Sequence, residues 1–194
     1  HGRPVDRLRT AVRPLAEAGK LGSVLCQLAP WVHFDSERLE YLASLPARLP
    51  GFTLAVEFRH RSWLPDHLDE TLRALSDARL AHVIVDAPAH AVPRVATATS
   101  ATAVWRLHGR NAEGWLRQLR GEEPSVREKY DYLYSEGELR ALLPEIEAVG
   151  AETEEVFISF NNNNRDYPVK NALMMRRLLG QPTPTVSTPL DLFP

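Results

Sequence analysis

Short apolar runs alternate with segments of helical spacing, and this alternation restricts the fold more than any other feature of the sequence. The strand-like runs are residues 23–28, 53–58, 81–85, 101–107 and 156–160. Alternation of this kind predicts a parallel sheet with helical crossovers. The sheet has two possible closures, an open doubly wound sheet or a (β/α) barrel. No glycine-rich phosphate loop follows any run, which weakens the dinucleotide-binding version of the open sheet.

The predicted helices differ in how clearly the sequence marks them. The clearest begins with the capping-box pair Ser135 and Glu138 and continues into an amphipathic segment. Others follow from apolar residues at helical spacing in 5–15, 39–45, 68–75 and 172–179. We interpret residues 109–134 as a long polar connection. The run 23–28 is nearly continuously apolar, which predicts a strand buried on both faces.

Composition restricts the class of protein but not its reaction. The chain has 194 residues and a formal net charge of -2, so it carries no global basic field that would attract nucleic acid. Its one cysteine, Cys26, fits a reducing compartment and predicts a cytoplasmic protein. No apolar run has the length of a membrane span, so we expect no membrane partner. We expect one domain over 1–180 and a proline-rich tail over 181–194.

Polar residues end every predicted strand, and in a parallel sheet these ends meet at one side. We assign candidate catalytic roles to Glu57, Asp86 and His108, whose carboxylates and imidazole suit acid–base work. Candidate substrate-binding residues are Gln27, Arg59, Arg106, Asn161 and Asn162. Arg59 and Arg106, together with Arg110, have the chemistry to grip a phosphate or carboxylate. We predict that Glu57, Asp86, Arg106, His108 and Asn161 line one cavity.

Each candidate also has a structural interpretation, which stays open at this point. Glu57 and Arg106 lie inside apolar runs and would satisfy one another as an ion pair. Asp86 would cap the segment that follows it, and the asparagines from Asn161 would form a turn. A divalent metal at Glu57, Asp86 and His108 is a further alternative. The chain has no tight His-x-His grouping, and the metal and any cofactor stay unknown.

Six motifs in order resemble the YecE-like family, a domain of unknown function. They are Gln27-Leu28 with Pro30, residues 55–60 with Ser62-Trp63-Leu64, Asp86 with Pro88, residues 106–109, Tyr134-Ser135, and Phe160-Asn161-Asn162. The resemblance implies a TIM-like (β/α) barrel with its site at the carboxyl ends of the strands. About five β/α units are present where a full barrel has eight strands, so we expect that the first strands are missing. Asn163, Asn164 and Arg165 depart from the family pattern.

Three functions remain open from the sequence. The first is a hydrolase- or isomerase-like enzyme acting on a phosphate- or sugar-bearing ligand, or on a nucleic-acid fragment. The second is a non-catalytic module that binds an anionic ligand or nucleic acid, although the net charge does not indicate nucleic acid. The third is an inactive, truncated barrel. Exposed sheet edges at 23–28 and 156–160 predict self-association, unless the tail from Gln181 covers them.

Overall fold

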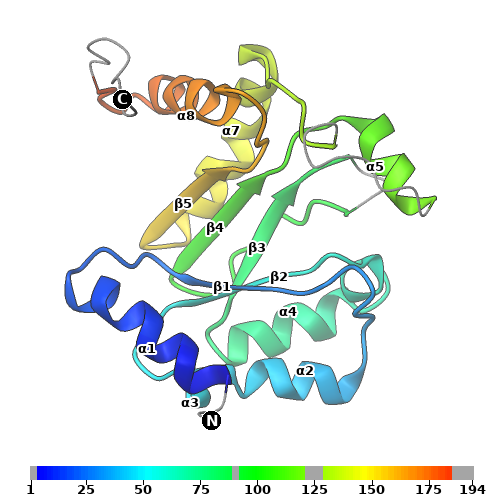
Figure 1. Cartoon of the computed structure of the whole chain (residues 1–194), viewed down its shortest axis with the longest axis vertical. Coiled ribbons are helices and arrows are strands. Elements are labelled where there is room, and N and C mark those ends of the chain that lie inside the picture. The colour runs from blue at the N-terminus through cyan, green and yellow to red at the C-terminus, as the bar shows by residue number, and fades with distance from the viewer. Residues whose placement is uncertain (1–3, 89–91, 121–128, 185–194) are drawn as a thin grey trace, which may run out of the picture.

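The five predicted strands form one parallel sheet. The computed structural model describes residues 4–88, 92–120 and 129–184. Its strands lie in sequence order, and every neighbouring pair is parallel, as predicted. They are β1 (Val24–Gln27), β2 (Leu54–Glu57), β3 (Ala81–Asp86), β4 (Thr102–Leu107) and β5 (Glu155–Phe160). All five strands therefore end at the same side of the sheet (Figure 1).

Helices fill most of the connections, and side chains cap the first turns of two of them. They are α1 (Pro4–Glu17), α2 (Ser36–Ala43), α3 (Leu45–Arg48), α4 (Leu68–Asp77), α5 (Ala112–Leu119), α7 (Glu136–Ala151) and α8 (Tyr167–Leu178), with a short 3-10 helix at Arg61–Trp63. The Asp35 carboxylate caps α2. The capping box predicted at Ser135 and Glu138 is present at the start of α7. It satisfies backbone N–H groups that the first turn of a helix leaves free.

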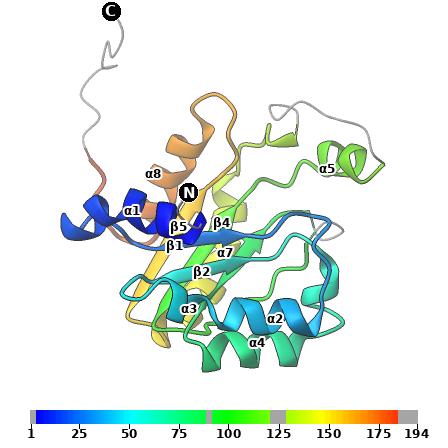
Figure 2. The same cartoon turned by 60° about the horizontal axis from the view of Figure 1, so that its bottom comes forward.

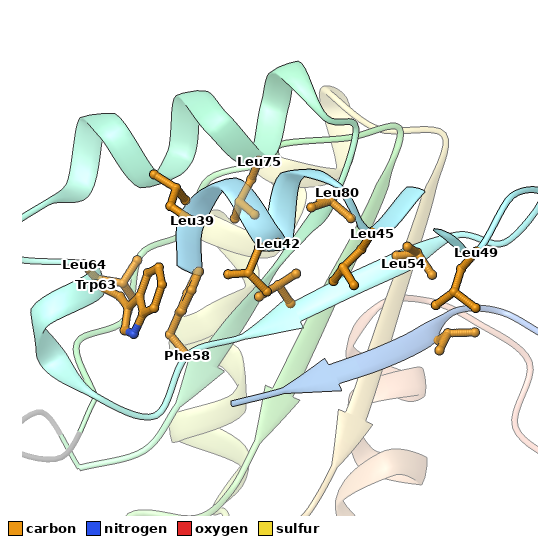
Figure 3. Close-up of a cluster of buried hydrophobic side chains, with 12 residues drawn as sticks. Leu39, Leu42, Leu45, Leu49, Leu54, Phe58, Trp63, Leu64, Leu75 and Leu80 are labelled. Atoms are coloured by element: carbon orange, nitrogen blue, oxygen red, sulfur yellow. The ribbon is translucent and has the colours of Figure 1, made fainter. Parts of the chain in front are cut away.

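Alternate residues of the strands face two different layers. On the outer face, one apolar cluster joins β2 to α2, α3 and α4, with Leu42, Leu75 and Phe58 among its members (Figure 3). A second outer cluster, which includes Trp105 and Leu139, joins β4 to α7. The inner face carries a cluster of smaller residues, Ala55, Ala81, Val83, Val85, Val92 and Val104. This division leaves the inner face free to present the polar residues at the strand ends.

The sheet curls around its inner face but is not closed. β1 and β5 are its two edges. At the amino-terminal side the edges come close, since a Cβ atom at Gly22 would lie 2.8 Å from Cζ of Phe157 on β5 (Figure 2). No pairing joins β1 to β5 in the part of the chain that the structure describes. The structure therefore has an open parallel sheet, whereas the expected barrel closure is not seen.

Two expectations about single segments were wrong. β1 is not buried on both faces, because Leu25 is 39% exposed and Gln27 is exposed, as an edge strand on an open inner face allows. The connection at 109–134 contains the helix α5, whose Trp115 is buried. Its length of only eight residues and its glycine, Gly114, masked the helical pattern. The predicted tail is described only as far as residue 184, so its folding back lies outside the described residues.

Three tryptophans, Trp63, Trp105 and Trp115, are buried. Cys26 is half-buried, and burial raises the pKa of its thiol, which disfavours the reactive thiolate. None of the helices that the structure describes has the length and apolar character needed to cross a membrane.

Candidate functional site

Parallel pairing brings polar residues from four strands together on the inner face, near the carboxyl ends of the strands. Gln27 on β1 pairs with Glu57 on β2. Arg106 on β4 pairs with Val85 on one side and Ser159 on the other. His108 and Asn161 directly follow β4 and β5, and the Asn161 N–H donates to the Leu107 carbonyl at 2.7 Å. Residues that lie far apart in the sequence therefore become neighbours because parallel strands end together.

The Glu57 carboxylate lies at the centre of this group. Its side chain is completely buried and forms ion pairs with Arg59 and Arg106. The Nε2 atom of His108 lies 3.2 Å from Oε1 of Glu57. Gln27 joins the two arginines, because its Oε1 accepts from Arg59 at 3.1 Å and from Arg106 at 3.0 Å. The structural Glu57–Arg106 pair is therefore present, as part of a larger group that we call the Glu57 cluster: Gln27, Glu57, Arg59, Arg106, His108 and Asn161.

Asparagine side chains set the protonation of His108. Asn163 donates to the Asn161 Oδ1 at 3.2 Å, which turns the Asn161 NH₂ group toward His108. That NH₂ group lies 2.9 Å from Nδ1 of His108. With Nδ1 accepting, a neutral ring carries its proton on Nε2, which lies 3.2 Å from both Oε1 of Glu57 and the Arg59 guanidinium. Contacts at both ring nitrogens hold His108 in one orientation.

The electrostatics of the cluster favour an ionised Glu57 beside a neutral His108. Burial alone would raise the pKa of Glu57, but the hydrogen bond from His108 and the charges of Arg59 and Arg106 lower it to about 2. Burial lowers the pKa of His108 to about 4, helped by the two arginines, although Glu57 opposes the change. At neutral pH the cluster therefore holds one carboxylate and two guanidinium groups.

Lys129 is a cation beside the cluster that sequence reasoning missed. Its side chain is 8% exposed, and its ammonium lies 3.7 Å from the centre of the Trp115 ring. Burial and the charge of Arg59 lower its pKa to about 8. The only signal in the sequence is the pair of aromatic residues, Trp115 and Tyr130, within a polar stretch. Such residues commonly hold a cation over their ring faces.

Asp86 belongs to a different group, which we call the Asp86 network. Its carboxylate accepts from Arg94 at 2.7 Å, from Arg110 at 2.9 Å through two N–H groups, and from the Tyr134 hydroxyl at 2.7 Å. These partners hold the pKa of Asp86 low against the opposing effect of burial. Arg94 continues the network to Glu145 on α7. Arg110, which we predicted to bind an anionic ligand, forms its ion pair with the Asp86 carboxylate.

The two groups touch through the backbone. The His108 N–H donates to the Asp86 carbonyl at 2.8 Å, and the Gly109 N–H donates to the Tyr134 hydroxyl at 2.9 Å. Gly109 has a φ of +85°, which a residue with a side chain rarely adopts. The Asp86 network therefore fixes the chain where His108 leaves β4. The structure brings Asp86 beside the cluster through its backbone, while its carboxylate bonds elsewhere.

Asn162 lies under the site as a buried connector. It is fully buried, and its NH₂ group donates to the Tyr132 carbonyl at 2.7 Å and to Asn171 at 2.9 Å. Asn171 in turn donates to the Tyr134 carbonyl at 2.8 Å. These bonds tie the segment before α7 to α8. The contacts of Asn162 are those of a structural residue, and its predicted binding role stays a prediction.

Two further observations concern metal ligands and the position of a surface hollow. Within residues 4–88, 92–120 and 129–184, no three His, Cys, Asp or Glu side chains are grouped so as to hold a metal ion. A hollow of about 790 Å³ lies at the opposite, amino-terminal ends of the strands, where Thr53 and Thr102 contribute to its wall. That the predicted residues line one cavity stays a prediction.

Comparisons with known proteins support a single family. The model described as "Protein of unknown function DUF72" matches residues 1–191. The UPF0759 protein YunF of Bacillus subtilis (strain 168) is 31% identical over 180 residues, which are 90% of this chain and 63% of that protein. A DUF72 family protein from Thermotoga maritima MSB8 has a TM-score of 0.81 at 31% identity, over 91% of this chain and 65% of that one.

A second solved structure agrees with the first. A DUF72 family protein from Enterococcus faecalis V583 has a TM-score of 0.84 at 27% identity, over 96% of this chain and 69% of that one. The chain thus spans less than two thirds of the length of YunF and of the Thermotoga protein.

Proposed function

This chain belongs to the DUF72 family of proteins of unknown function, and we propose that its Glu57 cluster binds the anionic group of a small ligand, a phosphate or carboxylate. One observation carries the proposal. Among the residues that the structure describes, the Glu57 carboxylate is the one acidic group paired with Arg59 and Arg106, whose side chains are only 6% and 13% exposed. The cluster therefore has an excess of positive charge that water screens poorly.

The hydrogen-bonding chemistry of the cluster suits an oxyanion. A guanidinium group has five N–H donors in a planar fork that matches the oxygens of a phosphate or carboxylate. Glu57 and Gln27 take some of these donors and hold both guanidinium groups in place before a ligand arrives. Lys129, whose ammonium lies over the Trp115 ring, adds a third positive charge near Arg59, and burial together with that arginine lowers its pKa to about 8. Preorganised positive groups of this kind are what an anion site requires.

Titration with inorganic phosphate at low ionic strength, followed by calorimetry, tests the proposal. We expect Arg106→Gln to weaken phosphate binding at least tenfold, about 1.4 kcal/mol, and Arg106→Lys to restore part of it. The matched control is Arg140→Gln, which removes an exposed arginine on α7. Absence of phosphate binding by the unmodified chain, or equal binding by Arg106→Gln, would refute the proposal.

A second candidate function, a hydrolase- or isomerase-like enzyme, is favoured by the Glu57–His108 contact. A carboxylate that lies against an imidazole nitrogen is a common arrangement for general acid–base catalysis. His108 is fully buried and Asn161 faces its Nδ1, so catalysis would require Asn161 to yield that atom to a ligand. Asp86 has no part in this proposal because its carboxylate bonds to Arg94, Arg110 and Tyr134.

His108→Gln separates the two functions. If the site is only a binding site, the variant still binds phosphate and no substrate is turned over by either protein. If the site is an enzyme, a screen of phosphate monoesters and sugar phosphates finds turnover that His108→Gln removes while phosphate binding persists. Turnover that survives in His108→Gln would contradict the catalytic role of His108.

We make three further proposals, on the subfamily of the chain, its location in the cell and the closure of its sheet. We propose the YecE-like family within DUF72, on the motifs of the sequence, and a cytoplasmic location, on the single cysteine. We also propose that β1 and β5 are the seam of a (β/α) barrel, where further strands would pair. The free edges of both strands and the greater length of the relatives support this closure.

A further inference from the structure

Trp31 is the most exposed large hydrophobic side chain among the residues that the structure describes. It is 77% exposed, whereas Trp63, Trp105 and Trp115 are buried. Its exposure is not the result of a loose loop, since the turn that carries it is bonded on both sides. The Val32 N–H donates to the Ala29 carbonyl at 2.9 Å, and the indole N–H of Trp63 donates to the Val32 carbonyl at 2.8 Å. A fixed turn therefore presents a large apolar face to water.

This turn stands beside the anion site. It follows β1, whose last residue, Gln27, accepts hydrogen bonds from Arg59 and Arg106. Two residues after Trp31, the ring of His33 stacks on that of His60 at 3.8 Å, and His60 directly follows Arg59 in the chain. The Phe34 N–H also donates to the Ser62 hydroxyl at 2.8 Å. The loop of Trp31 and the loop of Arg59 are thus packed together at the carboxyl ends of β1 and β2.

We propose that the ligand of the Glu57 cluster is a phosphorylated ring compound, whose ring lies flat on Trp31 while its phosphate binds Arg59 and Arg106. This inference rests on the proposed anion site and adds the class of ligand to it. An indole face attracts any flat ring face, either a nucleobase or the C–H face of a sugar. Gln27, which is exposed beside Arg106, has the amide to bond polar groups of that ring.

Collisional quenching by acrylamide measures the solvent exposure of Trp31. The other three tryptophans of the chain are buried, so a neutral quencher reaches Trp31 in preference to them. The probes are adenosine monophosphate, glucose 6-phosphate, adenosine and inorganic phosphate. We expect one or both ring phosphates to lower the quenching constant at least twofold, whereas inorganic phosphate leaves it unchanged. The two ring phosphates distinguish a nucleobase from a sugar as the stacked ring.

Calorimetry on Trp31→Ala provides the second measurement. Stacking on an aromatic side chain is worth about tenfold in affinity, so the variant should bind the ring phosphate about tenfold more weakly. It should bind inorganic phosphate within twofold of the unmodified chain. Trp31→Phe should retain part of the ring selectivity. The matched control is Tyr41→Ala, which removes another exposed aromatic ring, 50% exposed on α2, outside the site.

The outcomes separate this inference from the proposal beneath it. If inorganic phosphate binds but Trp31→Ala leaves the ring phosphates equally well bound, the inference is refuted and the anion site stands. If no phosphate compound binds at all, both are refuted. If Trp31→Ala changes only the mass measured by light scattering, Trp31 is a contact between copies of the chain and the inference is refuted.

Discussion

Glu57→Gln provides the sharpest test of the electrostatics of the site. The substitution keeps the size of the side chain but removes the negative charge that Arg59, Arg106 and His108 surround. The pKa of Glu57 falls from 4.5 to about 2, because the opposing effect of burial is outweighed by His108 and the two arginines. At about 1.4 kcal/mol per pKa unit, the ionised side chain contributes about 3 kcal/mol to folding at pH 7. Loss of one partner from a buried ion pair costs a similar amount, about 3–5 kcal/mol.

The pH dependence gives this prediction its sign. Because the pKa of Glu57 is lower in the folded chain, its contribution is fully present above pH 4.5 and is lost as the pH falls toward 2. The difference in unfolding free energy between the unmodified chain and Glu57→Gln should therefore be about 3 kcal/mol at pH 7. At pH 3 it should fall to roughly half of that value.

Urea denaturation at pH 7 and pH 3, with thermal melts in parallel, measures the effect. For a chain of this size, a loss of about 3 kcal/mol should lower the Tm by roughly 6–12 °C. The control is Glu136→Gln, which breaks an exposed pair with Arg140 on α7 and should cost less than about 0.5 kcal/mol. Equal stability of Glu57→Gln and the unmodified chain at pH 7 would show that Glu57 is not held by its cationic neighbours.

Three further predictions concern the backbone, the core and the sheet edges. Gly109→Ala should lower the unfolding free energy by roughly 1–3 kcal/mol more than Gly180→Ala. Both glycines have a positive φ, but a Cβ at Gly109 would lie 2.7 Å from the neighbouring loop, whereas one at Gly180 meets open space; equal losses in urea denaturation would contradict this. His82 is buried, and burial outweighs nearby groups to lower its pKa to about 4, so protonation opposes folding. Protonation of His82 should lower the unfolding free energy by roughly 3 kcal/mol between pH 7 and pH 4. If His82→Phe loses as much stability over this range as the unmodified chain, His82 is not the source of the loss. The exposed edge residues Leu25 and Phe157 predict that the purified chain dimerises or aggregates; a monodisperse monomer in light scattering would show otherwise.

Much of the fold could be predicted from the sequence because its signals are local. Apolar runs bounded by prolines or polar residues predicted every strand of the sheet, and the alternation with helices predicted parallel pairing. The capping box at Ser135 and Glu138 located the start of α7. The burial of β1 on both faces was predicted wrongly, because an apolar run alone does not show which faces are covered, whereas its predicted place at a sheet edge was confirmed.

The candidate site could be predicted only in part. Charges within apolar runs indicated Glu57 and Arg106, since such charges require partners. Nothing in the sequence told which arginine would pair with which carboxylate, so Arg110 was grouped with Arg59 although it binds Asp86. Lys129 lay in a polar connection, where the aromatic pair Trp115 and Tyr130 was its only signal.

The sequence by itself determined which residues form strands and which charges need a partner, because backbone propensity and desolvation act on each residue where it stands. Only the tertiary structure decided how the charges were distributed among partners. Parallel register placed Gln27 beside Glu57, packing of the strands brought Arg106 of β4 into contact with both, and the turn of Asn161 and Asn163 placed an amide group against Nδ1 of His108. The physical reason is that the interaction between two charges depends on their separation and on the medium around them, and both quantities arise only when distant strands are packed together.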